Sequence, residues 1–135
     1  MNTKIVPSVC SYCGTGCGVL FHAVDGKLVG TMPLKTHPVN QGKLCKKGWQ
    51  LHEYSNSPTR LKAPLTKVDG NFKQVTWDKA IQSTSDKLKG IVEKYGPDSV
   101  GILVSAKMTN EENYLAQKFA RAGIGTNNVD HCARL

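Results

Sequence analysis

The 135-residue sequence contains no long hydrophobic run. A helix that spans a bilayer needs about 20 consecutive apolar residues, and no stretch approaches that length. The N-terminus also lacks the basic patch and the apolar core of roughly 7 to 15 residues that mark a signal peptide. We therefore expect neither export nor membrane insertion and predict a cytoplasmic protein. Its 39% hydrophobic and 21% charged residues are typical of a globular domain.

Acidic side chains are scarce, because ten Asp and Glu stand against 18 Lys and Arg, which gives a net charge of +8. Residues 1–62 hold eight of the basic and two of the acidic side chains, so most of the excess lies there. Such an excess indicates an anionic partner. The longest basic run is Lys46-Lys47 and no interleaved aromatic residues accompany it, which argues against nucleic acid.

A disulfide framework is not expected either. The five cysteines are an odd number, and cytosolic thiols stay reduced. Metal or redox chemistry is therefore the leading interpretation of these residues.

The first third of the chain predicts a small β unit. Short β-type runs cover residues 5–9, 19–24 and 27–30, and Asp25-Gly26 between the last two is a hairpin signal. The few apolar residues make a thin core, so this unit needs a structural cofactor. We assign it residues 1–60.

The second unit, residues 61–135, follows a connection that runs from Tyr54 to Pro64. Apolar residues at helical spacing predict a helix over 77–95, with Thr76 as N-cap and Gly96-Pro97 as terminator. Residues 99–104 are suited to a buried strand. Thr109 and Glu112 form a capping box ahead of a second helix.

A parallel α/β sheet needs several strands, and only one is convincing here. The predicted fold is therefore a small β-rich unit followed by the start of an incomplete α/β domain.

Four cysteines carry the strongest motif. Cys10, Cys13 and Cys17 form C-x2-C-x3-C, and Cys45 follows at a distance. Four thiolates can hold a cubane [4Fe-4S] cluster, with three from one tight loop and a distant fourth. The alternate glycines of residues 14–18 permit close backbone approach in that loop.

A four-cysteine zinc site, with His22 or His37 as substitute ligands, stays open on spacing alone. It is less favoured because Cys45 has no partner cysteine nearby. Haem attachment is excluded because Gly14 follows Cys13. We expect Cys132 to be a small buried apolar residue. His52 and His131 carry no specific signal.

Several segments together resemble the N-terminal part of a molybdopterin-dependent formate dehydrogenase catalytic (alpha) subunit. They are CSYCGTGC, LCKKGW, VTWDKAI and TNEENYLAQKFARAGIGTNNVDHCARL. The cysteine pattern is shared with nitrate reductases and respiratory NADH dehydrogenases, whereas residues 109–135 are more specific to formate dehydrogenases.

The resemblance implies that Cys10, Cys13, Cys17 and Cys45 bind a [4Fe-4S] cluster, and that Lys47 relays electrons between cluster and pterin. It also implies a Mo or W ion held by two molybdopterin guanine dinucleotides, whose pyrophosphates are the expected anion. The ammonium of Lys47 can meet that anion as a point charge.

Lys107 is a second candidate for binding this cofactor, at a position where relatives tend to have Arg. Lys lacks the bidentate fork that Arg offers a phosphate, and a solvated loop lysine is the equal alternative.

The family places selenocysteine or cysteine, then histidine, directly after the position of Leu135. We therefore expect the polypeptide to continue past Leu135, with Arg134 and His131 flanking the active site. These 135 residues alone should be inactive.

The predicted function is the iron–sulfur portion of a formate dehydrogenase or CO2 reductase that relays electrons to an outside carrier. The expected partners are the rest of the catalytic subunit and ferredoxin-like iron–sulfur subunits, with a hydrogenase as a further candidate. The alternatives are another molybdopterin oxidoreductase of the nitrate reductase type and a small stand-alone iron–sulfur electron carrier.

Overall fold

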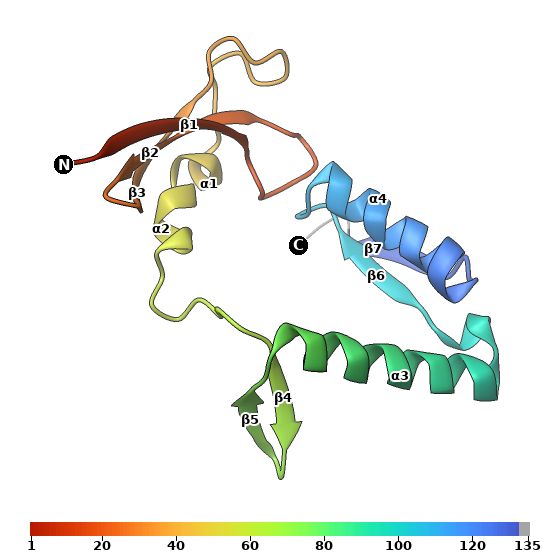
Figure 1. Ribbon diagram of the computed structural model, residues 1–135. Coiled ribbons are helices and arrows are strands. Elements are labelled where there is room, and N and C mark those ends of the chain that lie inside the picture. Colours follow the sequence, from red (N-terminus) through yellow and green to blue (C-terminus); the bar gives the residue numbers. More distant parts are fainter. Residues whose placement is uncertain (133–135) are drawn as a thin grey trace. The chain divides into compact units, whose positions relative to one another are not determined.

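A computed structural model describes residues 1–132 (Figure 1). The described chain divides into two compact units. The first contains residues 1–60, 103–116 and 131–132, and the second contains 61–102 and 117–130. The expected domain division after residue 60 stays a prediction.

The first unit is built on a three-stranded antiparallel sheet in the order β1-β2-β3. β1 is Thr3–Val9, β2 is Gly18–Val24 and β3 is Lys27–Pro33, which confirms the predicted strands. Asp25 and Gly26 both have positive φ, of 47° and 81°, as a tight hairpin turn with the twist of the strands requires.

Two short helices, α1 (Lys46–Trp49) and α2 (Leu51–Ser55), pack against β3 and were not predicted. The buried hydrophobic cluster of this unit consists of Cys10, Val19 and Leu51. This confirms the expectation of a thin core, and one of its members is a candidate metal ligand.

The second unit opens with an antiparallel hairpin of β4 (Leu65–Val68) and β5 (Asn71–Gln74), which was also not predicted. Asp69 and Gly70 turn it with positive φ of 50° and 80°, as in the first hairpin. The predicted connection is shorter than expected, because α2 extends to Ser55.

The predicted long helix is confirmed as α3 (Trp77–Tyr95). The Thr76 hydroxyl accepts a hydrogen bond from the Lys79 amide at 3.3 Å, so Thr76 is the N-cap. Gly96 ends the helix at a φ of 85°, which side-chain-bearing residues rarely adopt.

The expectation of a single strand in this part was wrong. β6 (Ile102–Ser105) pairs with β7 (Val129–Cys132). Hydrogen bonds from Ile102 N to Asn128 O and from Ala106 N to Cys132 O join residues of equal sequence separation, so the strands are parallel. β6 begins later than predicted because Pro97–Ser99 form a 3-10 turn.

The capping box before α4 (Asn110–Lys118) is confirmed. The Thr109 amide donates to the Glu112 carboxylate at 2.8 Å, and the Glu112 amide donates to the Thr109 hydroxyl at 3.2 Å. A π-helical segment, Phe119–Ile124, continues the helix.

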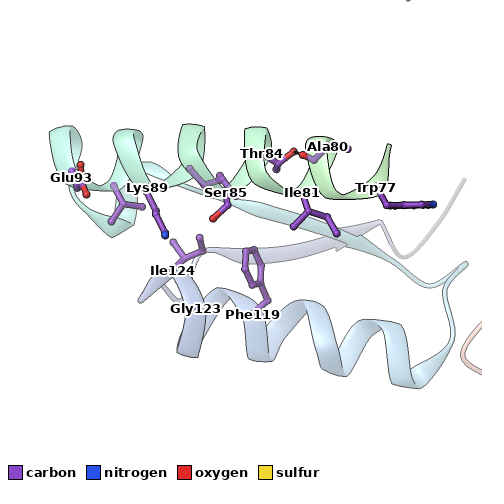
Figure 2. Close-up of a pocket in the computed structure, with 12 residues that line it drawn as sticks. Trp77, Ala80, Ile81, Thr84, Ser85, Lys89, Glu93, Phe119, Gly123 and Ile124 are labelled. Atoms are coloured by element: carbon purple, nitrogen blue, oxygen red, sulfur yellow. Dashed lines mark hydrogen bonds between the residues drawn. The ribbon is translucent and has the colours of Figure 1, made fainter. Parts of the chain in front are cut away.

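An apolar hollow of about 840 Å³ separates α3 from the π-helical segment (Figure 2). Ile81 of α3 and Phe119 of the π-helical segment point into it from opposite sides. No residue of α3 is buried. The fold is thus mixed α/β, with small antiparallel sheets followed by helices and a parallel strand pair, as expected for the start of an α/β domain.

Within residues 1–132, no helix is both long and apolar enough to cross a membrane.

Candidate metal centre

Three of the candidate ligands lie in the loop that joins β1 to β2. The pairing of Val9 with Gly18 closes this loop, and Cys10 N donates to Cys17 O at 2.8 Å. Gly16 adopts a φ of 70°, which lets the chain turn back within a few residues. The β1–β2 hairpin therefore brings the first and third cysteines of the motif together.

The fourth cysteine is delivered by a long loop that a single buried side chain fixes. Asn40 accepts a hydrogen bond from Gly18 N at 2.8 Å and donates to Gly18 O at 3.1 Å and to Lys43 O at 2.8 Å. Cys45 follows as the N-cap residue of α1. Asn40 thus ties the segment before Cys45 to the end of the cysteine loop.

The four thiols lie close enough to influence one another electrostatically. Burial raises the pKa of Cys17, and the negative charges of Cys10, Cys13 and Cys45 raise it further. Burial is also the main cause of the raised pKa of Cys10, and Cys13 and Cys45 add to it. A metal group that binds the thiolates would remove this mutual repulsion.

Cys13 differs from its neighbours because its pKa is lowered. Its Sγ lies 3.3 Å from Thr15 Oγ1, and hydrogen bonds from the side chain and backbone of Thr15 stabilise the thiolate. The positive charge of Lys47 acts in the same direction. The loop therefore already favours the ligating form of one thiol.

The spacing of the thiols bears on the choice between zinc and a cluster. Among residues 1–132, no three His, Cys, Asp or Glu side chains stand close enough to share one metal ion. Thiolates on one zinc ion lie about 3.8 Å apart, because each Zn–S bond is about 2.3 Å. A cubane is wider, since each thiolate binds a different iron. Four cysteines whose charges act on one another's pKa match in number the four irons of a cubane.

Lys47 follows Cys45 by two residues and is the second residue of α1. Its ammonium nitrogen is 5.9 Å from the centre of the Tyr12 ring. The neighbouring Lys46 is exposed on the same helix.

Lys107 is exposed in the loop that follows β6. Its amide donates to Ser105 Oγ at 3.0 Å. The same loop reaches the cysteine loop, because Asn110 Nδ2 donates to Gly14 O at 2.7 Å. The structure therefore joins the loop that carries Lys107 to the loop that carries Cys13.

The histidines differ in their surroundings, and Nδ1 of His37 is buried without a hydrogen-bond partner among the described residues. His52 Nδ1 shares a hydrogen bond of 3.3 Å with Thr31 Oγ1, and the ring of His37 packs so closely on Gly18 that a Cβ there would overlap it. His22 is half-buried in β2.

Cys132 is exposed, so the expectation of burial was wrong. It is the last residue of β7. His131, in the same strand, is also exposed. The predictions for Arg134 and Leu135 lie outside the described residues.

Four functional candidates were missed in the sequence: Tyr12, Asn40, Tyr54 and Asn110. Asn40 and Asn110 act on residues 22 and 96 positions away. No local pattern of residues signals such contacts, although Tyr12 stands between two motif cysteines.

Two family descriptions match consecutive parts of the sequence. Residues 3–57 match the family described as molybdopterin oxidoreductase Fe4S4 domain, and residues 60–135 match the family described as molybdopterin oxidoreductase. The two matches together cover nearly the whole chain.

Two similar relatives are named as formate dehydrogenase alpha subunits. The chain is 50% identical over 135 residues to the F420-dependent formate dehydrogenase 1 subunit alpha of Methanococcus maripaludis. It is 45% identical over 135 residues to the F420-dependent formate dehydrogenase subunit alpha of Methanocaldococcus jannaschii. In both cases all of this chain aligns, and it spans 19% of the relative.

Among solved structures, acetylene hydratase from Pelobacter acetylenicus is similar, with a TM-score of 0.75 and 26% identity. The match covers 93% of this chain and 18% of that chain. Fold, cysteine loop and relatives agree, and the chain belongs to the molybdopterin oxidoreductase family, in which it comprises the Fe4S4 domain and the first part of the molybdopterin domain.

Proposed function

We propose that these residues are the electron-relay portion of a formate dehydrogenase or CO2 reductase. The observation that carries the proposal is the four-thiol site within a chain that aligns over its whole length with formate dehydrogenase alpha subunits. The chain spans 19% of those relatives, and the reaction is proposed for a protein of their length.

Cys10, Cys13, Cys17 and Cys45 are the proposed ligands of a [4Fe-4S] cluster. When bound, the cluster accepts and returns one electron at a time. The thiols lose their protons on binding, and the Thr15 contacts already favour this for Cys13. Burial of Cys10 in the core links cluster binding to folding of the unit.

Lys47 and Lys107 are the proposed contacts to the anionic pterin cofactor with its Mo or W ion. Both are exposed, and both lie in segments that contact the cysteine loop. The role of Lys47 is to hold positive charge beside the thiolates, which stabilises an added electron. The role of Lys107 is phosphate binding as a point charge.

The reaction is inferred from the relatives and not from the fold, because the fold is shared with a protein named as a hydratase. Identities of 50% and 45% over the whole chain favour formate over nitrate as the substrate class. The names of these relatives also make F420 a candidate electron acceptor beside ferredoxin-like subunits and a hydrogenase.

The test is an anaerobic assay of the full-length protein, with its metal content measured. We expect formate to reduce a viologen dye, with two electrons and one proton released for each CO2 formed, and no reduction of nitrate. Lys47→Met should slow this turnover while the iron content is kept, and Lys46→Met should have the smaller effect. Nitrate reduction without formate oxidation would contradict the proposal.

A further inference from the structure

The four-thiol site is bordered by a row of two aromatic and two cationic side chains. The ammonium of Lys47 lies over the Tyr12 ring at 5.9 Å, and the guanidinium of Arg60 lies over the Tyr54 ring at 5.1 Å. The two tyrosine rings meet edge to face, with centres 5.6 Å apart and an angle of 62° between planes. Each cation thus faces the electron-rich surface of one ring.

The two tyrosine rings are held in place by the buried core and by a hydrogen bond. Both tyrosines pack on the buried cluster of Cys10, Val19 and Leu51. The Tyr54 hydroxyl shares a hydrogen bond of 2.9 Å with Ser11 Oγ, next to Tyr12 in the chain. Tyr12 is therefore held by its neighbours in the chain, by the core and by a second ring.

The backbone under Lys47 is also fixed. Lys47 is the second residue of α1, and the buried Gly48 packs so closely on Leu44 that a Cβ would lie 3.1 Å from its Cδ2. The side chain of Lys47 is not fixed by this packing, because it is exposed and a lysine side chain has several bonds that rotate freely. The contact that places its ammonium is the face of the Tyr12 ring.

We propose that Tyr12 is a positioning residue, whose ring holds the ammonium of Lys47 beside the four-thiol site. This inference rests on the proposed function, because it assigns a role through Lys47 and the cluster. Tyr12 stands between Cys10 and Cys13, so the residue that directs the charge belongs to the loop that carries the ligands. A lysine free to swing into solvent would lose much of its influence, since water screens its charge.

The consequence is a dependence of the cluster's midpoint potential on the Tyr12 ring. A cation near the cluster stabilises the reduced, more negative form and so raises the potential. Lys47→Met should lower the potential. A Tyr12 ring that holds Lys47 less well should also lower the midpoint potential, by a smaller amount.

The test replaces Tyr12 with phenylalanine and then with phenylalanines carrying one, two and three ring fluorines. Fluorine withdraws electron density from the ring face while its size changes little, so folding should be retained. The potential is measured by EPR-monitored redox titration of the purified cluster-loaded protein. We expect Tyr12→Phe to keep the potential, each added fluorine to lower it stepwise, and the series to be flat in a Lys47→Met background.

The controls separate this inference from the proposed function. Absence of a cubane signal in the unaltered protein would overturn both. With the cubane present, a potential that does not respond to fluorination would overturn the role of Tyr12 alone. A series with the same slope in Lys47→Met would also overturn it, because the ring would then act on the cluster directly. A stepwise decrease in potential that persists in Lys46→Met and vanishes in Lys47→Met supports the role of Tyr12 as the residue that positions Lys47.

Discussion

At the scale of single residues, the cysteine site depends on a side chain that no ligand motif contains. Asn40 is buried, and the three hydrogen bonds of its side chain go to backbone groups around the cysteine loop and the approach to Cys45. An asparagine can accept and donate at once, which the opposed N–H and C=O of Gly18 require. Replacement of Asn40 therefore leaves several buried backbone groups without their hydrogen-bond partner.

We predict that Asn40→Ala lowers the free energy of unfolding by about 3 kcal/mol, because each buried group left unpaired costs about 1–3 kcal/mol. The measurement is denaturant unfolding followed by the visible absorbance of the cluster. Asn56→Ala is the matched control, since Asn56 makes one exposed bond to Leu28 O. Equal losses for the two variants would show that Asn40 does not fix the loop.

At the scale of elements, the loop after β6 and the cysteine loop are coupled through one close contact. Asn110 donates to Gly14 O, and a Cβ at Gly14 would come within 2.9 Å of Asn110 Oδ1. Gly14 N also donates to Ala106 O at 3.4 Å. The start of α4 thus leaves no room for a side chain at position 14.

The prediction is that Gly14→Ala and Asn110→Ala each speed the release of iron to a chelator. Iron release from the double variant should be accelerated by less than the two single effects combined, because removal of the Asn110 side chain makes room for the new methyl group. Chelator-driven iron release, followed by stopped flow, gives the three rates. Additive effects would mean that the two side chains do not interact.

Elements with strong local signals could be predicted from the sequence. α3 has apolar residues at helical spacing, a threonine cap and a terminal glycine, and its bounds were found. The Asp25-Gly26 hairpin lies between apolar runs and was found as well. Here local preference and final structure agree.

Elements that depend on distant partners were missed. β7 contains Asp130 and His131 and has no apolar run, so only its pairing with β6 makes it a strand. The β4–β5 hairpin has the Asp69-Gly70 turn, but its strands are short and largely exposed. α1 is a single turn, too short for periodicity to show.

The candidate ligands were predictable because their chemistry is visible in their spacing, whereas their surroundings were not. The spacing of the cysteines can be recognised from the sequence alone. The ring that faces Lys47 and the amide that clamps Gly18 are contacts across 35 and 22 positions. Such contacts form only when the sheet and the loops are in place.

At the scale of the whole molecule, the two units should respond differently to loss of the metal group. The first has a core of three buried residues, one of them Cys10. The second contains the 19-residue helix α3, which is capped at its start by Thr76 and holds no candidate ligand. Cluster binding therefore supplies folding energy mainly to the first unit.

We predict that anaerobic removal of iron with a chelator increases amide hydrogen exchange in β1, β2 and β3, while exchange in α3 changes much less. Hydrogen exchange with mass spectrometry resolves the segments. Uniform loss of protection along the chain would contradict independent stabilisation of the first unit.

The nature of the metal centre is tested by quantitation of iron, inorganic sulfide and zinc in anaerobically purified protein, together with the EPR spectrum after reduction. Four cysteines whose charges act on one another's pKa, in a chain that matches the Fe4S4 domain family, predict about four irons and four sulfides per chain and a cubane-type signal. One zinc per chain, without iron or sulfide, would contradict it.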